Sequence, residues 1–112
     1  MSAKKTEVQM VLERHLEELK FCPVREFQFN PARKWRADYY FEVHGPRYTF
    51  CRYLLEIEGG AFTQGRHTRG KGFIADMEKY NMAAILGYRV LRFTPQQILS
   101  GEAKEFLKKW LG

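Results

Sequence analysis

The stretch Leu-Leu-Glu-Ile-Glu-Gly-Gly at residues 54–60 constrains the fold most, because it leads a buried strand directly into two carboxylates and two glycines. Side chains alternate between the faces of a strand, so Glu56 and Glu58 point to one side and Leu55 and Ile57 to the other. The two carboxylates then stand roughly 7 Å apart. At this spacing they can share one hard cation or divide the roles of metal ligand and base.

A simpler interpretation of this stretch is an exposed edge strand whose carboxylates are solvated. The apolar neighbours Leu54, Leu55 and Ile57 favour a largely buried strand instead. Like charges beside a core repel each other and are costly to desolvate, and a metal ion is the usual compensation. The stretch therefore indicates a metal site at the rim of an active site.

Helices are predicted on both sides of the strands. Apolar residues at i, i+3, i+4 spacing predict a helix over residues 6–20, with Ser2 or Thr6 as N-cap and an end at Cys22-Pro23. A second helix is predicted over 73–86, with Gly87 at its C′ position. Thr94-Pro95 begins a last helical region with a candidate break at Ser100-Gly101.

Four strands are predicted. Three cover residues 25–29, 48–58 and 88–93, and the one between the first two starts in the basic cluster at 33–36 and ends at Phe41. In this aromatic strand Asp38 shares a face with Arg36 and Tyr40. The opposite face is predicted to carry Trp35, Ala37, Tyr39 and Phe41.

A turn at residues 44–46 makes the Asp38 strand and the Glu56 strand a hairpin, so Asp38 and the Glu56/Glu58 pair are predicted to end neighbouring strands. The helical crossover makes the 48–58 and 88–93 strands parallel. The prediction is one α/β (α+β) domain over residues 1–112, with a mixed four-stranded sheet flanked by helices in the order αβββαβα.

The charge balance favours a polyanionic partner such as nucleic acid, because 19 Lys and Arg against 13 Asp and Glu give a net charge of +6. Cys22 and Cys51 show no metal-binding spacing and are predicted to be reduced core thiols. Neither a signal peptide nor a membrane span is indicated, so a cytoplasmic location is expected.

The order of these features resembles the PD-(D/E)XK nuclease superfamily: an aspartate at a strand end, Glu-x-Glu on the next strand, then a helix and a strand. The runs at 56–60 and 87–93, with the loop to the Asp76 helix between them, are similar to the small branch related to very-short-patch mismatch repair endonucleases and to phage and bacterial endonuclease-domain proteins. The resemblance covers nearly the whole chain. It implies a restriction-endonuclease-like, three-layer fold.

The resemblance also implies that Asp38, Glu56 and the backbone carbonyl of Ile57 bind Mg²⁺, for which Mn²⁺ can substitute, and that the ion activates water and stabilises charge on the scissile phosphate. Glu58 departs from the pattern, which has lysine at this place. Some members carry a carboxylate there, so Glu58 is predicted to orient or deprotonate the water, or to help bind a second metal.

The lysine's role then falls to another residue, either Lys79 from the helix or, as the weaker candidate, Lys71 from the loop. The alternative for Lys79 is a solvated residue paired with Asp76 at i+3. His67 is a candidate general acid or base, because related enzymes use loop histidines, although a lone histidine in a basic loop more often contacts phosphate or has no role. From the first helix, Glu7 and Glu13 are candidates to join the metal, with exposed charge as the default.

Two basic clusters flank the proposed site and are predicted to contact DNA phosphates, although some members can simply keep the domain soluble. They comprise Arg33, Lys34, Arg36, Arg66, Arg69 and Lys71.

The expected function is a Mg²⁺-dependent DNA endonuclease, acting on duplex, mismatched or branched DNA. An inactive nucleic-acid-binding module with the same fold is the alternative, supported by the glutamate at position 58. Nicking requires only a monomer, whereas double-strand cleavage favours a homodimer.

Overall fold

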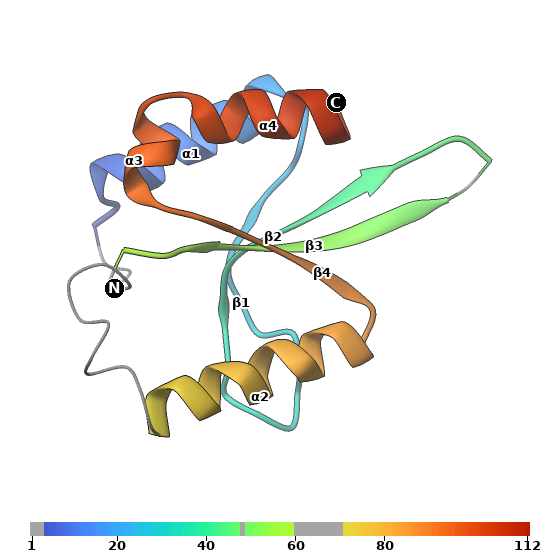
Figure 1. Cartoon of the computed structure of the whole chain (residues 1–112). Helices are drawn as coiled ribbons and strands as arrows, with labels where there is room; N and C mark the ends of the chain where they lie inside the picture. Colours follow the sequence, from blue (N-terminus) through green and yellow to red (C-terminus); the bar gives the residue numbers. More distant parts are fainter. Residues whose placement is uncertain (1–3, 48, 60–70) are drawn as a thin grey trace.

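The computed structural model describes residues 4–47, 49–59 and 71–112, which form a sheet between two layers of helices (Figure 1). The element order is αβββαβαα, because the last predicted helical region is divided into two helices at Ser100-Gly101. The elements are α1 (Glu7–Glu18), β1 (Val24–Phe27), β2 (Ala37–His44), β3 (Phe50–Ile57), α2 (Lys71–Ile85), β4 (Tyr88–Phe93), α3 (Pro95–Leu99) and α4 (Glu102–Leu111).

The sheet has the strand order β1-β2-β3-β4. Strand β2 pairs antiparallel with β1 and with β3, whereas β3 pairs parallel with β4 across the α2 crossover. The mixed four-stranded sheet flanked by helices is therefore confirmed. Helices α1, α3 and α4 cover one face of the sheet, and α2 lies alone on the other (Figure 1).

Local capping explains several element boundaries. Thr6 caps α1 with a reciprocal pair of hydrogen bonds to Gln9, and Thr94 caps α3 in the same way with Gln97. After α2, Gly87 adopts a φ of +90°, a left-handed conformation that glycine tolerates best. This turn starts β4 at Tyr88, as the sequence predicts.

The larger core fills the space between the sheet and the three-helix layer. Strand residues Tyr39 and Leu55 are fully buried there against helix residues of α1, α3 and α4. The helix residues with at most 1% exposure in this core are Leu12, Leu16, Ile98, Ala103 and Leu107.

A second, smaller core lies under α2 and contains Ala37, Leu54 and Ala83, with Trp35 packed against it. The predicted placement of Trp35 on the face opposite Asp38 is wrong, because β2 begins only at Ala37 and its alternation does not extend back to Trp35. Ala37, the first residue of β2, also belongs to this smaller core. The ring of Trp35 instead stacks on Phe29, with centroids 6.3 Å apart.

The β2–β3 hairpin projects beyond the helices (Figure 1). Its turn is closed by a hydrogen bond from the Gly45 amide to the Thr49 carbonyl at 2.7 Å. Of the two free cysteines, Cys51 is half-buried but Cys22 is exposed, so the prediction of a core thiol is wrong for Cys22. None of the helices in the described ranges has the length and apolar character needed to cross a membrane.

Candidate metal and phosphate site

Asp38 is the second residue of β2, and it lies beside the end of β3 because the two strands are antiparallel. The sequence suggested that Asp38 ends its strand, but Asp38 lies at the beginning of β2. The β2–β3 ladder starts at the Tyr39–Leu55 pair. One step beyond, Asp38 Oδ2 accepts a hydrogen bond of 2.8 Å from the Ile57 amide, so this carboxylate takes the place of a backbone acceptor.

The direction of the Ile57 carbonyl follows from this bond. The N–H and C=O of one strand residue point toward the same neighbouring strand, and the Ile57 N–H points toward β2. The next residue, Glu58, donates its amide to the Phe93 carbonyl on the β4 side at 2.9 Å. The Ile57 carbonyl is therefore on the Asp38 side of β3.

Glu56 is the one charged residue buried in the described part of the chain, with 7% of its surface exposed. Continuing the β2–β3 register places it directly opposite Asp38. From α2, Lys79 Nζ donates to Glu56 Oε1 at 2.7 Å and to the Arg36 carbonyl oxygen at 2.9 Å. Lys79 thus reaches the Glu56 carboxylate, which is one of the alternatives that the sequence left open, and it connects the segment before β2 to the end of β3.

Burial raises the pKa of the Glu56 carboxyl above its ordinary value of 4.5. The Lys79 ammonium opposes this effect, whereas the nearby Asp38 carboxylate adds to it by repulsion. Two carboxylates thus face one lysine, which leaves a local excess of negative charge. This charge balance is suited to one more cation.

Glu58 is held separately from Glu56. Arg92 Nε donates to Glu58 Oε1 at 2.8 Å, and the Tyr80 hydroxyl approaches the same oxygen at 3.3 Å. The hydrogen bond to Glu58 raises the pKa of Arg92, and burial raises that of Tyr80. The expected role of Glu58 as catalyst or metal ligand stays a prediction, since its recorded partners are a cation and a phenol.

Arg33 differs from the two other predicted phosphate contacts in its segment. Its guanidinium binds Glu78 at 2.8 Å and lies 3.8 Å from the centre of the Trp35 ring. Lys34 and Arg36 are exposed, and all three line a polar hollow of about 530 Å³ with Gln28, Pro31 and Ala32. Since Lys79 binds the Arg36 carbonyl, this hollow adjoins the carboxylates.

Three of the predicted site residues, Arg66, His67 and Arg69, lie outside the described residues, as does the side chain of Lys71. Of the α1 candidates, Glu7 is exposed and Glu13 is engaged elsewhere. Glu13 Oε2 accepts a 2.7 Å hydrogen bond from the hydroxyl of Tyr39, whose ring belongs to the core under the three-helix layer. Glu13 is therefore on the opposite face of the sheet from Glu56.

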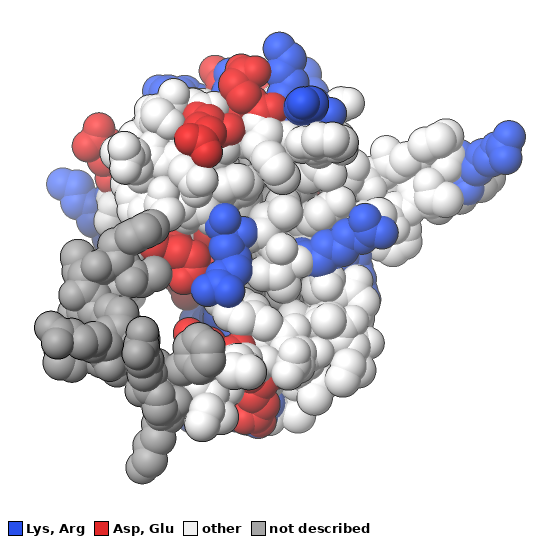
Figure 2. Space-filling view, in the orientation of Figure 1, with Lys and Arg blue, Asp and Glu red and all other residues white. Residues whose placement is uncertain are grey.

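On the face that Figure 2 shows, the charged side chains are spread over the surface and do not form one patch. Basic side chains there form separate groups, with acidic ones among them, and one basic group occupies the far end of the projecting hairpin. Arg47 is exposed in this turn. The local hollow beside Lys79 is thus a more specific candidate for phosphate binding than the overall charge.

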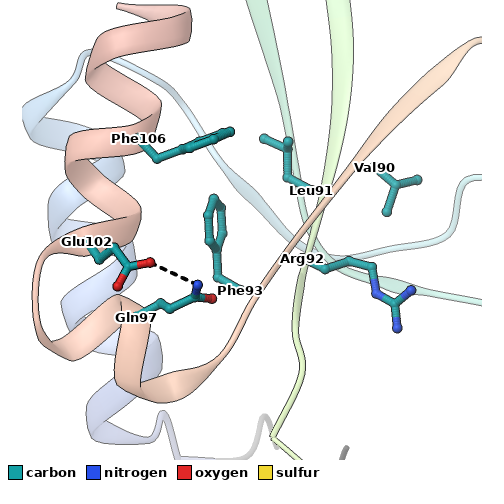
Figure 3. A pocket seen from close by; sticks show the side chains of 7 residues that line it. All are labelled: Val90, Leu91, Arg92, Phe93, Gln97, Glu102 and Phe106. Atoms are coloured by element: carbon teal, nitrogen blue, oxygen red, sulfur yellow. Dashed lines mark hydrogen bonds between the residues drawn. The ribbon is translucent and has the colours of Figure 1, made fainter.

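A second hollow, of about 410 Å³, lies between β4 and the α3–α4 segment (Figure 3). Gln97 and Glu102 hydrogen-bond at 3.0 Å on one side of it, and the side chain of Arg92 extends away from Phe93 and Phe106. Arg92 therefore directs its charge toward Glu58 and not into this hollow.

The donor set fits a hard divalent cation. Such ions prefer oxygen ligands, and the Asp38 and Glu56 carboxylates and the Ile57 carbonyl supply oxygens at one end of the sheet. Within the described ranges, no three His, Cys, Asp or Glu side chains come together to hold an ion. A metal here would thus depend on two carboxylates and a backbone oxygen, the set that the resemblance implies.

Two partners at the site were not predicted: the Arg36 carbonyl for Lys79 and the Arg92 guanidinium for Glu58. Neither follows from a sequence pattern, because the parallel register that sets Arg92 opposite Glu56 is a property of the folded sheet. No family model, curated protein or solved structure matches the chain. Function is therefore inferred from the geometry of the residues themselves.

Proposed function

We propose that the chain is a Mg²⁺-dependent DNA endonuclease of the PD-(D/E)XK type, which hydrolyses a phosphodiester bond with metal-activated water. One observation carries the proposal: Asp38, Glu56 and Lys79 come from β2, β3 and α2 and converge at one end of the sheet, where a buried carboxylate meets a lysine at 2.7 Å. Ionisable groups perturbed by burial and by a specific partner are concentrated at functional sites.

Each residue has a distinct role in this proposal. A bound Mg²⁺ supplies charge stabilisation at the phosphate and lowers the pKa of a water molecule. Asp38 and Glu56 provide carboxylate oxygens, and the hydrogen bond from the Ile57 amide orients Asp38. Lys79 takes the place of the motif lysine: its ammonium favours the ionised form of Glu56 against the effect of burial and can donate to a phosphate oxygen or to the attacking water.

DNA is the proposed substrate because the net charge is +6 and the exposed Lys34 and Arg36 stand beside the Lys79 contact. Arg66, Arg69 and Lys71 are proposed as further phosphate contacts, and His67 remains the candidate acid or base. A cytoplasmic location is part of the same proposal.

One observation favours a second candidate, an inactive nucleic-acid-binding module. The Lys79 ammonium already compensates the buried Glu56 carboxylate at 2.7 Å, and Arg92 compensates Glu58 at 2.8 Å. In such a module the carboxylates serve as structural ion pairs, and no metal is required for the fold.

Supercoiled plasmid separates the two candidates. Wild-type protein is incubated with Mg²⁺ or Mn²⁺, with EDTA as a control, beside the variants Asp38→Asn, Glu56→Gln and Lys79→Met. Matched controls are Glu42→Gln, which changes an exposed carboxylate on the hairpin, and Lys104→Met, which removes a lysine paired with Glu18.

The nuclease predicts nicked or linear plasmid that EDTA and the three site variants abolish and the two controls retain. Salt-sensitive DNA binding without cleavage, together with no heat of Mg²⁺ or Mn²⁺ binding in calorimetry, supports the inactive module. Cleavage that persists in Asp38→Asn and Glu56→Gln contradicts the proposed site.

A further inference from the structure

Helix α2 has an outer face that nothing in the described chain covers. Its inner residues fix this orientation: Ala83 is fully buried and Lys79 binds Glu56 under the helix. Among the large apolar residues of the outer face, Ile74, Met77 and Ile85 are 63%, 50% and 77% exposed. Because α2 is alone on its side of the sheet (Figure 1), this face forms one flank of the molecule.

Six residues define the α2 outer face, and they line a shallow hollow of about 430 Å³. They are Ile74, Met77, Glu78, Asn81, Met82 and Ile85. Exposed apolar clusters of this kind usually mark a contact with another macromolecule.

From this face we infer that the chain forms a homodimer in which two α2 helices pack antiparallel about a two-fold axis. A two-fold contact must be self-complementary, so that residue i of one copy meets residue j of the other and the reverse. A two-fold axis midway between Lys79 and Tyr80 sets Ile74 against the partner's Ile85 and Met77 against the partner's Met82.

The chemistry of the remaining pair supports the same arrangement. Glu78 is set against the partner's Asn81, so each carboxylate meets an amide donor and not a second carboxylate. Arg33 holds Glu78 on its own chain at 2.8 Å and leaves the carboxylate side chain 54% exposed.

A single helix pair is a small interface. Helix α2 has 15 residues and is therefore roughly 22 Å long. Stable interfaces need about 800 Å² from each partner, so the pair belongs to the weaker, reversible class. The dimer is thus expected to dissociate on dilution. This inference is independent of the proposed nuclease activity.

Sedimentation velocity over a roughly hundredfold range of protein concentration tests the dimer. The substitution Ile85→Glu introduces charge twice in a two-fold interface and is expected to raise the dissociation constant by at least about a hundredfold. Trp110→Glu is the matched control, because Trp110 on α4 is 64% exposed and lies outside the proposed contact. Circular dichroism of each variant verifies folding.

A charge-reversal pair tests the antiparallel register. Asn81→Glu sets two carboxylates against each other across the interface and is expected to weaken the dimer. Adding Glu78→Lys to the same chain sets an ammonium against the carboxylate introduced at position 81 of the partner and is expected to restore the dimer.

A wild-type chain that stays monomeric at every concentration overturns the inference and leaves the face to a different protein. A dimer that Ile85→Glu does not weaken, or that the double variant does not restore, overturns the α2 contact.

Discussion

The Lys79 ammonium lies 2.7 Å from Glu56 Oε1, and the two residues come from different layers of the fold. Their side chains are only 16% and 10% exposed, so the pair is largely removed from water. Removing one partner of a buried pair leaves an uncompensated charge, which costs far more than the pair contributes as a whole.

Lys79→Ala is therefore expected to lower the free energy of unfolding by about 3 kcal/mol near neutral pH. The double variant Lys79→Ala/Glu56→Gln is expected to recover most of this loss, because the buried carboxylate is gone. Urea denaturation measures both. An equal loss in the single and double variants would show that the lysine stabilises the fold by packing and not by charge.

Glu56 gives stability a pH dependence of defined sign. Because burial raises its pKa in the folded state above 4.5, the folded protein binds a proton more readily than the unfolded chain. The stability from this group is complete below pH 4.5 and decreases as the pH rises through the folded pKa. Glu56→Gln cannot ionise and lacks this change, so the wild type is expected to become progressively less stable relative to Glu56→Gln as the pH rises from about 4 through that range. Urea denaturation of both proteins across this series measures the change, and a wild type that becomes more stable relative to Glu56→Gln with rising pH contradicts the prediction.

Arg33 and Arg36 are expected to act differently although they are neighbours. Arg33→Ala removes the Glu78 ion pair and the Trp35 stacking and should cost about 1 kcal/mol of stability. Arg36→Ala leaves stability nearly unchanged, because the backbone carbonyl that binds Lys79 remains.

For DNA binding, Arg36→Ala is expected to have a larger effect than Arg33→Ala. In a salt titration, Arg36→Ala reduces the slope of log affinity against log salt by about 1, as expected for one lost phosphate contact. Arg33→Ala has a smaller effect on this slope. The reverse result would identify Arg33 as the phosphate contact.

A substitution at Tyr39 is expected to change stability without changing cleavage, because the Tyr39 hydroxyl binds Glu13 on the face of the sheet opposite the carboxylate site. Tyr39→Phe leaves Glu13 without this donor and is expected to lower the free energy of unfolding by about 2 kcal/mol. Plasmid cleavage by the folded variant should be unchanged. Tyr40→Phe is the control: its hydroxyl binds the exposed Glu42, and its loss should change stability by about 0.5 kcal/mol or less.

The elements of this fold could be predicted from sequence because their signals are local. The Tyr88–Phe93 strand, the Thr6 cap and the glycine that ends α2 depend on neighbouring residues and on backbone geometry. The hairpin and the parallel crossover follow from connection length. Strand alternation also placed Glu56 and Glu58 on one face of their strand, and the structure shows that Lys79 of α2 meets Glu56 there.

The partners of the charged side chains were decided by tertiary structure alone. Lys79 binds Glu56 across 23 positions, Glu58 meets Arg92 across 34 and Arg33 meets Glu78 across 45. The sequence by itself offered Lys79 and Lys71 as alternatives and Arg33 as a phosphate contact. A charged side chain pairs with the opposite charge that folding brings nearest to it. The distance between the two side chains depends on how the helix and strands pack and not on any spacing along the chain.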